Sequence, residues 1–113
     1  MHLESKVEKE MCKRALKSYL DVLILSVLEN SEGMGGYDFL RLIHEEFGIF
    51  MSAGTIYSDL YALERKGLID FCSTRKRGAF KIADKGRQFM KAAHQTKNSI
   101  QNCIERIMKK RIS

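Results

Sequence analysis

Apolar residues recur at helical spacing from the beginning of the chain. Leu3, Val7 and Met11 are four residues apart, which predicts a short amphipathic helix that either frays into solvent or packs on a partner. The stretch LDVLILSVLEN, residues 20–30, then has the i, i+3, i+4, i+7, i+8 pattern of a buried helix. Neither proline nor glycine separates the two, so residues 1–30 form either two helices or one bent helix.

The glycine-rich segment NSEGMGG ends this helix, and the chain then turns into a second core helix. Phe39, Leu40, Ile43 and Phe47 share one face of it. Gly48 follows directly and suits the left-handed position at which helices often end.

A third helix is predicted to begin after Ser52, a good N-cap residue. Its residues Ile56, Leu60 and Leu63 lie one turn apart, so this face should be buried, and the helix should end at Gly67. The opposite face carries polar side chains and is the first candidate for ligand recognition.

Two short strands come next, in the segments LIDFCST and AFKI. Ile69 with Phe71, and Phe80 with Ile82, can each place apolar side chains on one face of a hairpin. Three helices followed by a hairpin is the order of a winged helix-turn-helix, a mainly α fold of the α+β class. In that architecture the third helix enters the DNA major groove, and the hairpin, or wing, lies over an adjacent groove or the backbone.

The end of the chain predicts a long helix from about Gly86 to Ile112. Apolar or small residues recur along it at heptad spacing. These residues are Phe89, Ala93, Thr96, Ile100, Cys103 and Ile107. A seam on a terminal helix has no partner inside the domain, so we expect a homodimer, with a monomer that folds the helix back as the alternative.

The pattern divides the chain into three parts. Residues 1–18 form a helix associated with the dimer, residues 19–84 the winged helix, and residues 85–113 the C-terminal dimerisation helix. Leu3, Val7 and Met11 join the seam residues as the expected dimer interface.

Length and charge narrow the function. The 113 residues suit one compact unit, and no apolar run reaches the roughly 18 to 20 residues that span a bilayer. The first residues do not resemble a secretory or transit signal, so we expect a cytoplasmic protein with no membrane partner. A net charge of +6 favours a polyanionic partner, above all double-stranded DNA.

Sites for catalysis are missing from the sequence. Cys12, Cys72 and Cys103 are odd in number and far apart, and the three histidines are scattered, so no metal ligand set or cofactor is expected. We interpret the cysteines as reduced packing residues, although a disulfide between two copies of Cys103 is conceivable. No dinucleotide, phosphate-loop or serine-hydrolase motif occurs, so the chain is not expected to be an enzyme.

Four stretches together resemble the PadR family of transcriptional regulators. They are LDVLILSVLEN, GGYDFLRLIHEEFG, SAGTIYSDLYALERKGLID and RKRGAFKIADKGRQFM, and they cover roughly residues 20–90. Ala53 and Ser58 stand where the family pattern has prolines, and Ala83 stands where it usually has threonine. The resemblance implies a dimeric winged-helix repressor of the shorter branch, which has a single C-terminal helix.

Candidate DNA contacts follow from the helix faces, the charges and the resemblance. On the third helix and at its start they are Ser52, Thr55, Tyr57, Ser58 and Tyr61. On the wing they are Arg75, Lys76, Arg77 and Lys81, and at the start of the second helix Tyr37. The contact of Tyr57 with the DNA backbone is implied by the resemblance.

Each of these assignments has a plainer alternative. Thr55 could merely continue the cap and Ser58 could be solvated. Tyr37 and Tyr61 could be packed aromatics, and the charged turn could serve solubility.

The function expected is sequence-specific DNA binding by a homodimer on an inverted repeat. One alternative is an adaptor whose positive wing meets an acidic protein. The other is a sensor that binds an unidentified small-molecule effector at the dimer interface.

Overall fold

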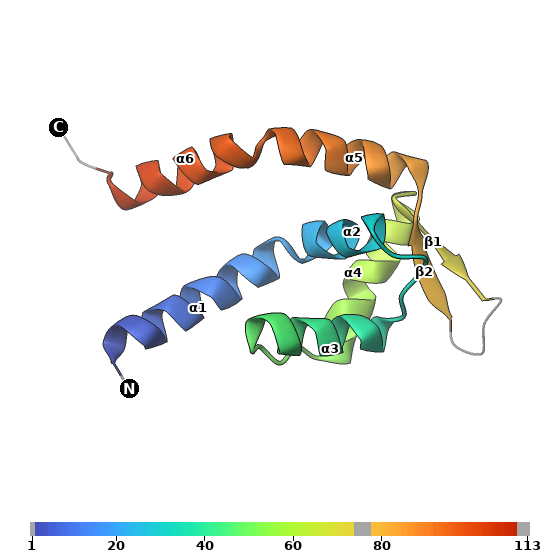
Figure 1. Cartoon of the computed structure of the whole chain (residues 1–113), viewed down its shortest axis with the longest axis horizontal. Helices are drawn as coiled ribbons and strands as arrows, with labels where there is room; N and C mark the ends of the chain where they lie inside the picture. Colours follow the sequence, from blue (N-terminus) through green and yellow to red (C-terminus); the bar gives the residue numbers. More distant parts are fainter. Residues whose placement is uncertain (1, 74–77, 111–113) are drawn as a thin grey trace.

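The computed structural model describes residues 2–73 and 78–110. The basic cluster Arg75, Lys76 and Arg77 therefore lies outside the described residues. In chain order the elements are α1 Leu3–Ser18, α2 Leu20–Glu29, α3 Gly36–Phe47, α4 Ala53–Arg65, β1 Ile69–Cys72, β2 Ala79–Ile82, α5 Asp84–Gln95 and α6 Lys97–Met108 (Figure 1). This is the predicted winged helix-turn-helix, with α1 before it and α5 and α6 after it.

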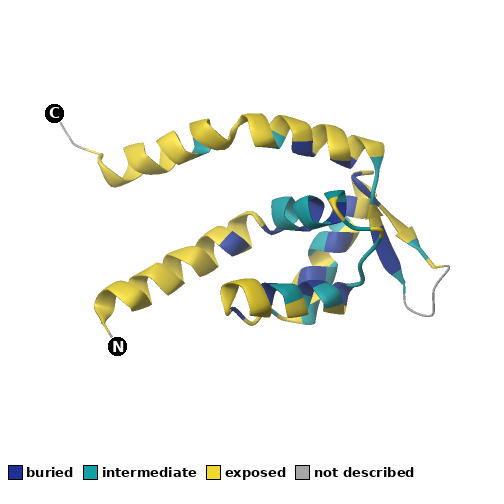
Figure 2. Ribbon diagram, viewed as in Figure 1, coloured by how far each residue is buried: buried dark blue, intermediate teal, exposed yellow. Residues whose placement is uncertain are grey.

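Helix α2 lies at the centre of the core and is covered by α4, α5 and β2 (Figure 2). The buried apolar side chains of α2, α3 and α4 lie mostly on the faces that the sequence predicts. They are Leu20, Ile24, Leu25 and Leu28 of α2, Phe39 and Ile43 of α3, and Ile56, Leu60 and Leu63 of α4. Phe47 does not join them, because at the end of α3 it is half exposed.

The predicted helix ends of the central helices are confirmed. Gly48 has φ +65° and its N–H donates to the carbonyl of His44, which ends α3. Gly67 has φ +76°, and the N–H groups of Gly67 and Leu68 donate to the carbonyls of Glu64 and Leu63 in a Schellman arrangement. A side chain at either glycine would meet the steric penalty of the left-handed region.

The hairpin pairs Ile69 with Ile82 and Phe71 with Phe80, so the four apolar side chains share one face, as predicted. One further pairing was not predicted. Met34 exchanges backbone hydrogen bonds of 3.0 and 2.8 Å with Phe80 and so adds a short bridge on the free side of β2. The glycine-rich segment after α2 is therefore more than a turn, because it ties α3 to the wing.

The N-terminal question is resolved in favour of two helices. Tyr19, with φ −112° and ψ 26°, separates α1 from α2. Of the residues of α1, Leu16 is buried against the core, and the rest of the helix projects into solvent (Figure 2).

The predicted single C-terminal helix is wrong in one respect, because it is broken at Thr96 into α5 and α6. Thr96 has φ −95° and ψ 0°, and its hydroxyl donates to the carbonyl of Ala93 at 2.8 Å. This side-chain bond to the preceding turn competes with continuation of the helix. Helix α5 packs on α2, whereas α6 has no buried residue in the part that the structure describes.

Helix α5 begins very close to β1. A β-carbon on Gly86 would lie 2.2 Å from the carbonyl oxygen of Leu68, so only glycine fits there. Nearby, Lys85 Nζ donates to the carbonyl of Lys66 at 2.9 Å, and at the other end of the helix His94 Nε2 lies 3.1 Å from Glu29 Oε1. These contacts fix α5, and not α6, to the winged helix.

The two terminal helices make the molecule elongated. Its radius of gyration is 16.2 Å, compared with about 13 Å for a compact domain of this length. The N-terminal end of α1 and the C-terminal end of α6 project from the same end of the molecule, opposite the wing (Figure 1). None of the described helices is both long enough and apolar enough to cross a bilayer.

Candidate nucleic-acid interface

Helix α4 begins with a well-formed cap. The Ser52 hydroxyl accepts a hydrogen bond of 3.1 Å from the Thr55 N–H and lies 2.8 Å from the Thr55 hydroxyl. Ser52 is thus the N-cap that the sequence predicts, and the Thr55 hydroxyl belongs to the same cap. The capped end is exposed, so its unpaired N–H groups remain open to an anionic group.

One stripe of α4 is exposed along the whole helix. Thr55, Ser58 and Tyr61 follow Ser52 at intervals of three residues and are all exposed, whereas the apolar face is buried in the core. Their spacing places their side chains on one side of the helix. The polar face predicted from the sequence is therefore exposed to solvent at Thr55 and Ser58.

The aromatic residues near this stripe form a connected row. Tyr37 of α3 packs edge-on against Tyr57, with 6.2 Å between ring centroids, and Tyr57 lies 5.9 Å from Tyr61. Tyr61 in turn lies 6.4 Å from Phe80 of the hairpin, whose ring is 5.1 Å from Phe71. Tyr37 is 63% exposed and Tyr61 is 49% exposed, while Tyr57 is half-buried between them. The row runs from the start of α3, across α4, to the wing.

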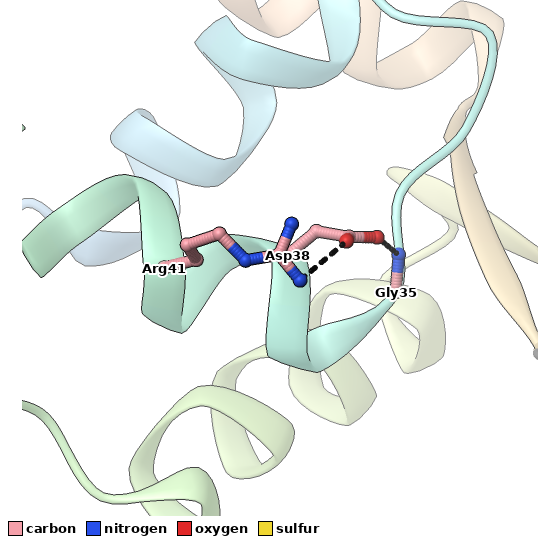
Figure 3. A network of polar contacts seen from close by, with 3 residues as sticks. All are labelled: Gly35, Asp38 and Arg41. Carbon is pink, nitrogen blue, oxygen red and sulfur yellow. Dashed lines mark hydrogen bonds and ion pairs between the residues drawn. The ribbon is translucent and has the colours of Figure 1, made fainter. Parts of the chain in front are cut away.

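The first turn of α3 is held by an acidic side chain. Asp38 Oδ2 accepts a hydrogen bond of 2.9 Å from the Gly35 N–H, and its Oδ1 lies 3.8 Å from Arg41 Nη2 (Figure 3). The carboxylate thereby satisfies an N–H at the helix start and carries a negative charge where the helix dipole favours it. This fixes the backbone that presents Tyr37.

The base of the wing is closely packed. A β-carbon on Gly78 would lie 2.1 Å from the Phe71 ring, so the ring covers the backbone where β2 is about to begin. On the other face, Lys81 is exposed and pairs in register with Asp70. Lys81 thus points away from the core, as expected.

One carboxyl group on α4 has a shifted pKa. The pKa of Asp59 is raised from its ordinary value, mainly by burial and then by the charge of Asp21 on α2, while Lys66 acts in the opposite direction. The ionised form is therefore disfavoured where α2 and α4 meet. This acidic pair is half-buried and does not belong to the exposed stripe of α4.

The residues expected at a dimer interface are mostly exposed in the single chain. Leu3 is 77% and Ile107 69% exposed, and Val7 and Met11 are each nearly half exposed. Thr96 and Cys103 are exposed as well, whereas Ala93 and Ile100 are partly covered.

Two neighbouring residues of α5 face different surroundings. Met90 faces the core and is 2% exposed, whereas the predicted Phe89 is 40% exposed. Met90 thus belongs to the core of the single chain, and Phe89 stays exposed as an expected interface residue.

A largely apolar groove lies between the N-terminal helices α1 and α2 and the C-terminal helices α5 and α6. It has a volume of about 420 Å³ and is lined from α1 and α2 by residues such as Leu16, Tyr19 and Leu23, and from α5 and α6 by Ala93 and Ile100. The expected interface residues Ala93 and Ile100 therefore share one wall of the groove.

No candidate for metal chemistry emerges from the part of the chain that the structure describes. There, no three His, Cys, Asp or Glu side chains form a group that could hold a metal ion.

A family model now connects this geometry with known proteins. The model of the transcriptional regulator PadR-like family matches residues 24–92, which is more than half of the chain. The chain belongs to this PadR-like family. The match begins within α2 and ends within α5, so it includes the capped α4 and the hairpin but neither α1 nor α6. The resemblance found in the sequence is confirmed, and the family and its solved structures are transcription regulators and not enzymes.

Individual relatives agree with the family. The PadR-like chain is 32% identical over 65 residues to the transcriptional activator GvpE of Haloferax mediterranei, which covers 58% of this chain and 34% of that protein. It therefore spans about a third of the length of this relative.

Solved structures share the fold. A PadR family transcription regulator from Clostridium difficile is 25% identical, with a TM-score of 0.70 over 80% of this chain and 98% of that one. A PadR family regulator from Eggerthella lenta is 19% identical, with a TM-score of 0.71 over 96% of this chain and 97% of that one. The second likeness concerns the fold alone, and it extends over nearly the whole PadR-like chain.

Proposed function

We propose that this PadR-like chain is a sequence-specific DNA-binding regulator that acts as a homodimer on an inverted repeat. The observation that carries the proposal is the exposed stripe of α4, which begins at an open, capped helix N-terminus and lies between the wing and the start of α3. A helix presented in this way enters the major groove with its N-terminal residues toward the bases.

Within the stripe, Ser58 is the best candidate for reading a base. Its side chain is exposed one turn beyond the cap, and a hydroxyl can both donate to and accept from base edges. Thr55 is less available for this, because its hydroxyl lies 2.8 Å from that of Ser52. Thr55 and Ser52 instead support contact with a phosphate at the helix N-terminus.

Phosphate contacts should supply much of the affinity. Tyr37 and Tyr61 offer hydroxyls on either side of Tyr57, and Lys81 offers a charge on the exposed face of the hairpin. In the sequence, Arg75, Lys76 and Arg77 fall between the two strands and add three further charges. Cations that neutralise phosphates release counterions, so binding should weaken as salt increases.

A homodimer would cover the surfaces that a single chain leaves open. Helices α1 and α6 expose Leu3, Val7, Met11 and Ile107, and the apolar groove lies between the two ends of the chain. We propose that these helices pack on a second copy. The two α4 helices would then reach successive major grooves about 34 Å apart, which requires an inverted repeat.

We propose further that the protein represses transcription in the cytoplasm. A dimer seated on promoter DNA excludes other proteins from the same site without any additional contact. The relative GvpE is named an activator, so a reporter gene with the selected site placed across or upstream of its promoter must distinguish the two outcomes. Repression from the site across the promoter is the expected result.

The main test is selection of bound duplexes from a random pool, with the mass in solution measured by light scattering. The expected result is one enriched inverted repeat and a mass twice that of the 13.0 kDa chain. A monomer that enriches no sequence would refute the proposal. An adaptor for an acidic protein would also enrich none.

The groove favours a second candidate function, regulation by a small apolar effector. Its walls are mostly apolar, and its volume of about 420 Å³ lies in the range of ligand pockets. An effector bound in the groove would change the packing of the terminal helices. It would thereby change the distance between the two α4 helices of the dimer. An apolar fluorescent dye that binds the dimer and is displaced when Leu23 is replaced by Trp would support this role.

A further inference from the structure

The ring of Tyr57 is seated directly on the backbone of α3. A β-carbon built on Gly36 would lie 2.4 Å from Tyr57 Cζ and 2.7 Å from its hydroxyl oxygen. A β-carbon does not approach a non-bonded atom this closely, so a side chain at Gly36 would displace the ring. Gly36 itself is buried by this contact.

The close contact with Gly36 determines where the Tyr57 hydroxyl points. Because this oxygen lies over the first residue of α3, it faces the neighbouring helix and not the exposed stripe of Ser58 and Tyr61. The rings on either side are far more open, with Tyr37 63% exposed and Tyr61 49% exposed. Tyr57 packs against both, at centroid distances of 6.2 and 5.9 Å.

We infer that Tyr57 is a positioning residue that sets α4 against α3 through Gly36, and that Tyr37 and Tyr61 make the contacts with the DNA backbone. This differs from the direct contact that the family resemblance implies for Tyr57. The inference rests on the proposed function, since it assigns roles within the same DNA-binding surface.

Physical reasons favour this division of roles. An edge-on or tilted aromatic contact holds its partners in a defined orientation, and the single ring of Tyr57 orients one tyrosine on each of two helices. Contacts with DNA require side chains held within about 0.5 Å of the productive geometry, so loss of the ring would misplace both neighbours. Loss of the hydroxyl alone would leave the ring, and hence the geometry, in place.

The test compares Tyr57→Phe with Tyr57→Leu for binding to the duplex that the wild-type protein selects. Stoichiometric titration gives the active fraction of each protein, and the measured affinity is corrected for it. Binding is measured at a temperature at which melting curves show that each variant is folded. Tyr57→Phe is expected to bind within about twofold of wild type, and Tyr57→Leu about tenfold or more weakly, because a tenfold loss requires only 1.4 kcal/mol of misplaced contacts.

Gly36→Ala is the second variant, and it keeps the inference testable if Tyr57→Leu does not fold. It retains every tyrosine but displaces the ring, so weakened binding by folded protein supports positioning. Tyr37→Phe and Tyr61→Phe, which remove hydroxyls from exposed rings, should each weaken binding more than Tyr57→Phe does.

Three outcomes would overturn the inference. If Tyr57→Phe binds as weakly as Tyr57→Leu, the hydroxyl itself contacts DNA. If folded Tyr57→Leu or Gly36→Ala binds like wild type, the ring positions nothing. If the wild-type protein selects no duplex, the proposed function fails first, and the assignment within it fails for that separate reason.

Discussion

One hydroxyl group organises the start of α4. Ser52 Oγ accepts from the Thr55 N–H and lies within hydrogen-bond distance of the Thr55 hydroxyl. Ser58, one turn further along, is exposed and takes no part in the cap. The two serines therefore have separable roles: Ser52 caps the helix, and Ser58 is the residue that we propose for recognition.

Ser52→Ala should lower the free energy of unfolding by about 1 kcal/mol, because an N–H at the helix start loses its acceptor. Ser58→Ala should change stability by less than about 0.5 kcal/mol, since it removes an exposed side chain from a helix interior. Denaturant unfolding measures both. The binding assay should give the reverse ranking for sequence preference, with Ser58→Ala altering the selected repeat. Equal loss of stability in both variants would contradict the capping role.

The second residue-scale feature is the carboxyl group of Asp59. Burial, followed by the charge of Asp21, raises its pKa, so the folded state binds a proton at this site more readily than the unfolded chain does. The stability associated with this group is present at low pH and is lost as pH rises through the raised pKa. At neutral pH the ionised carboxylate is therefore a cost.

Asp59→Asn should raise the free energy of unfolding at neutral pH. This gain in stability should become smaller as the pH falls toward the ordinary pKa of aspartate. Asparagine has nearly the same shape and no charge, so it removes the cost without opening a cavity. Unfolding of both proteins is followed across that pH range. A gain that does not depend on pH would show that ionisation of Asp59 is not disfavoured by its surroundings.

At the scale of elements, α5 is placed by contact with the segment that leads from α4 into β1. Gly86 brings the first turn of α5 against the carbonyl oxygen of Leu68, and Lys85 reaches the carbonyl of Lys66. Gly54, in the first turn of α4, is different, because a β-carbon there meets no atom closer than the Ser52 hydroxyl at 4.0 Å. The two helical glycines make a matched pair for mutagenesis.

Gly86→Ala should destabilise the protein by about 1 to 3 kcal/mol, the usual cost of an overpacked site, because backbone cannot move aside as a side-chain tip does. Gly54→Ala is the control and should be neutral or stabilising, by at most about 1 kcal/mol. Thermal melting compares them. Equal melting temperatures for the two variants would show that α5 tolerates a wider separation from the hairpin.

Much of this architecture follows from local signals in the sequence. Ser52, Gly48 and Gly67 mark helix ends because a cap or a left-handed residue acts on its own neighbours. The apolar faces of α2 and α4 follow for the same reason, since periodicity is a property of one segment.

The remaining features depend on contacts between distant segments. The bridge from Met34 to Phe80, the seat of Tyr57 on Gly36 and the burial of Met90 join residues from different elements, and no short-range pattern encodes them. The break at Thr96 was missed because the run of helix-forming residues contains no proline, while the competing bond comes from a threonine hydroxyl. The roles in DNA binding stay predictions.

At the scale of the whole molecule, the chain is elongated and its terminal helices expose apolar side chains. Leu3 and Ile107 are 77% and 69% exposed, so neither stabilises the single chain. Their replacement should therefore affect assembly and leave folding unchanged.

Leu3→Glu combined with Ile107→Glu should halve the mass in solution from twice 13.0 kDa to 13.0 kDa, because charges are costly to bury between two chains. Light scattering gives the mass, and the melting curve at equal concentration reports on folding. Phe50→Glu is the control, since Phe50 is 80% exposed but lies between α3 and α4, outside the proposed interface. A dimer that survives the double change would place the interface elsewhere.

The projection of both terminal helices from the end opposite the wing has an evolutionary consequence. The residues that would choose bases lie within residues 24–92, whereas α1 and α6 lie outside the family match. Lengthening, shortening or bending these outer helices could retune the distance between two half-sites while the code read by each half stays the same. A lineage could thus acquire new target genes by changing the arrangement of the terminal helices alone. The break between α5 and α6 at Thr96 is one position at which such a change can occur.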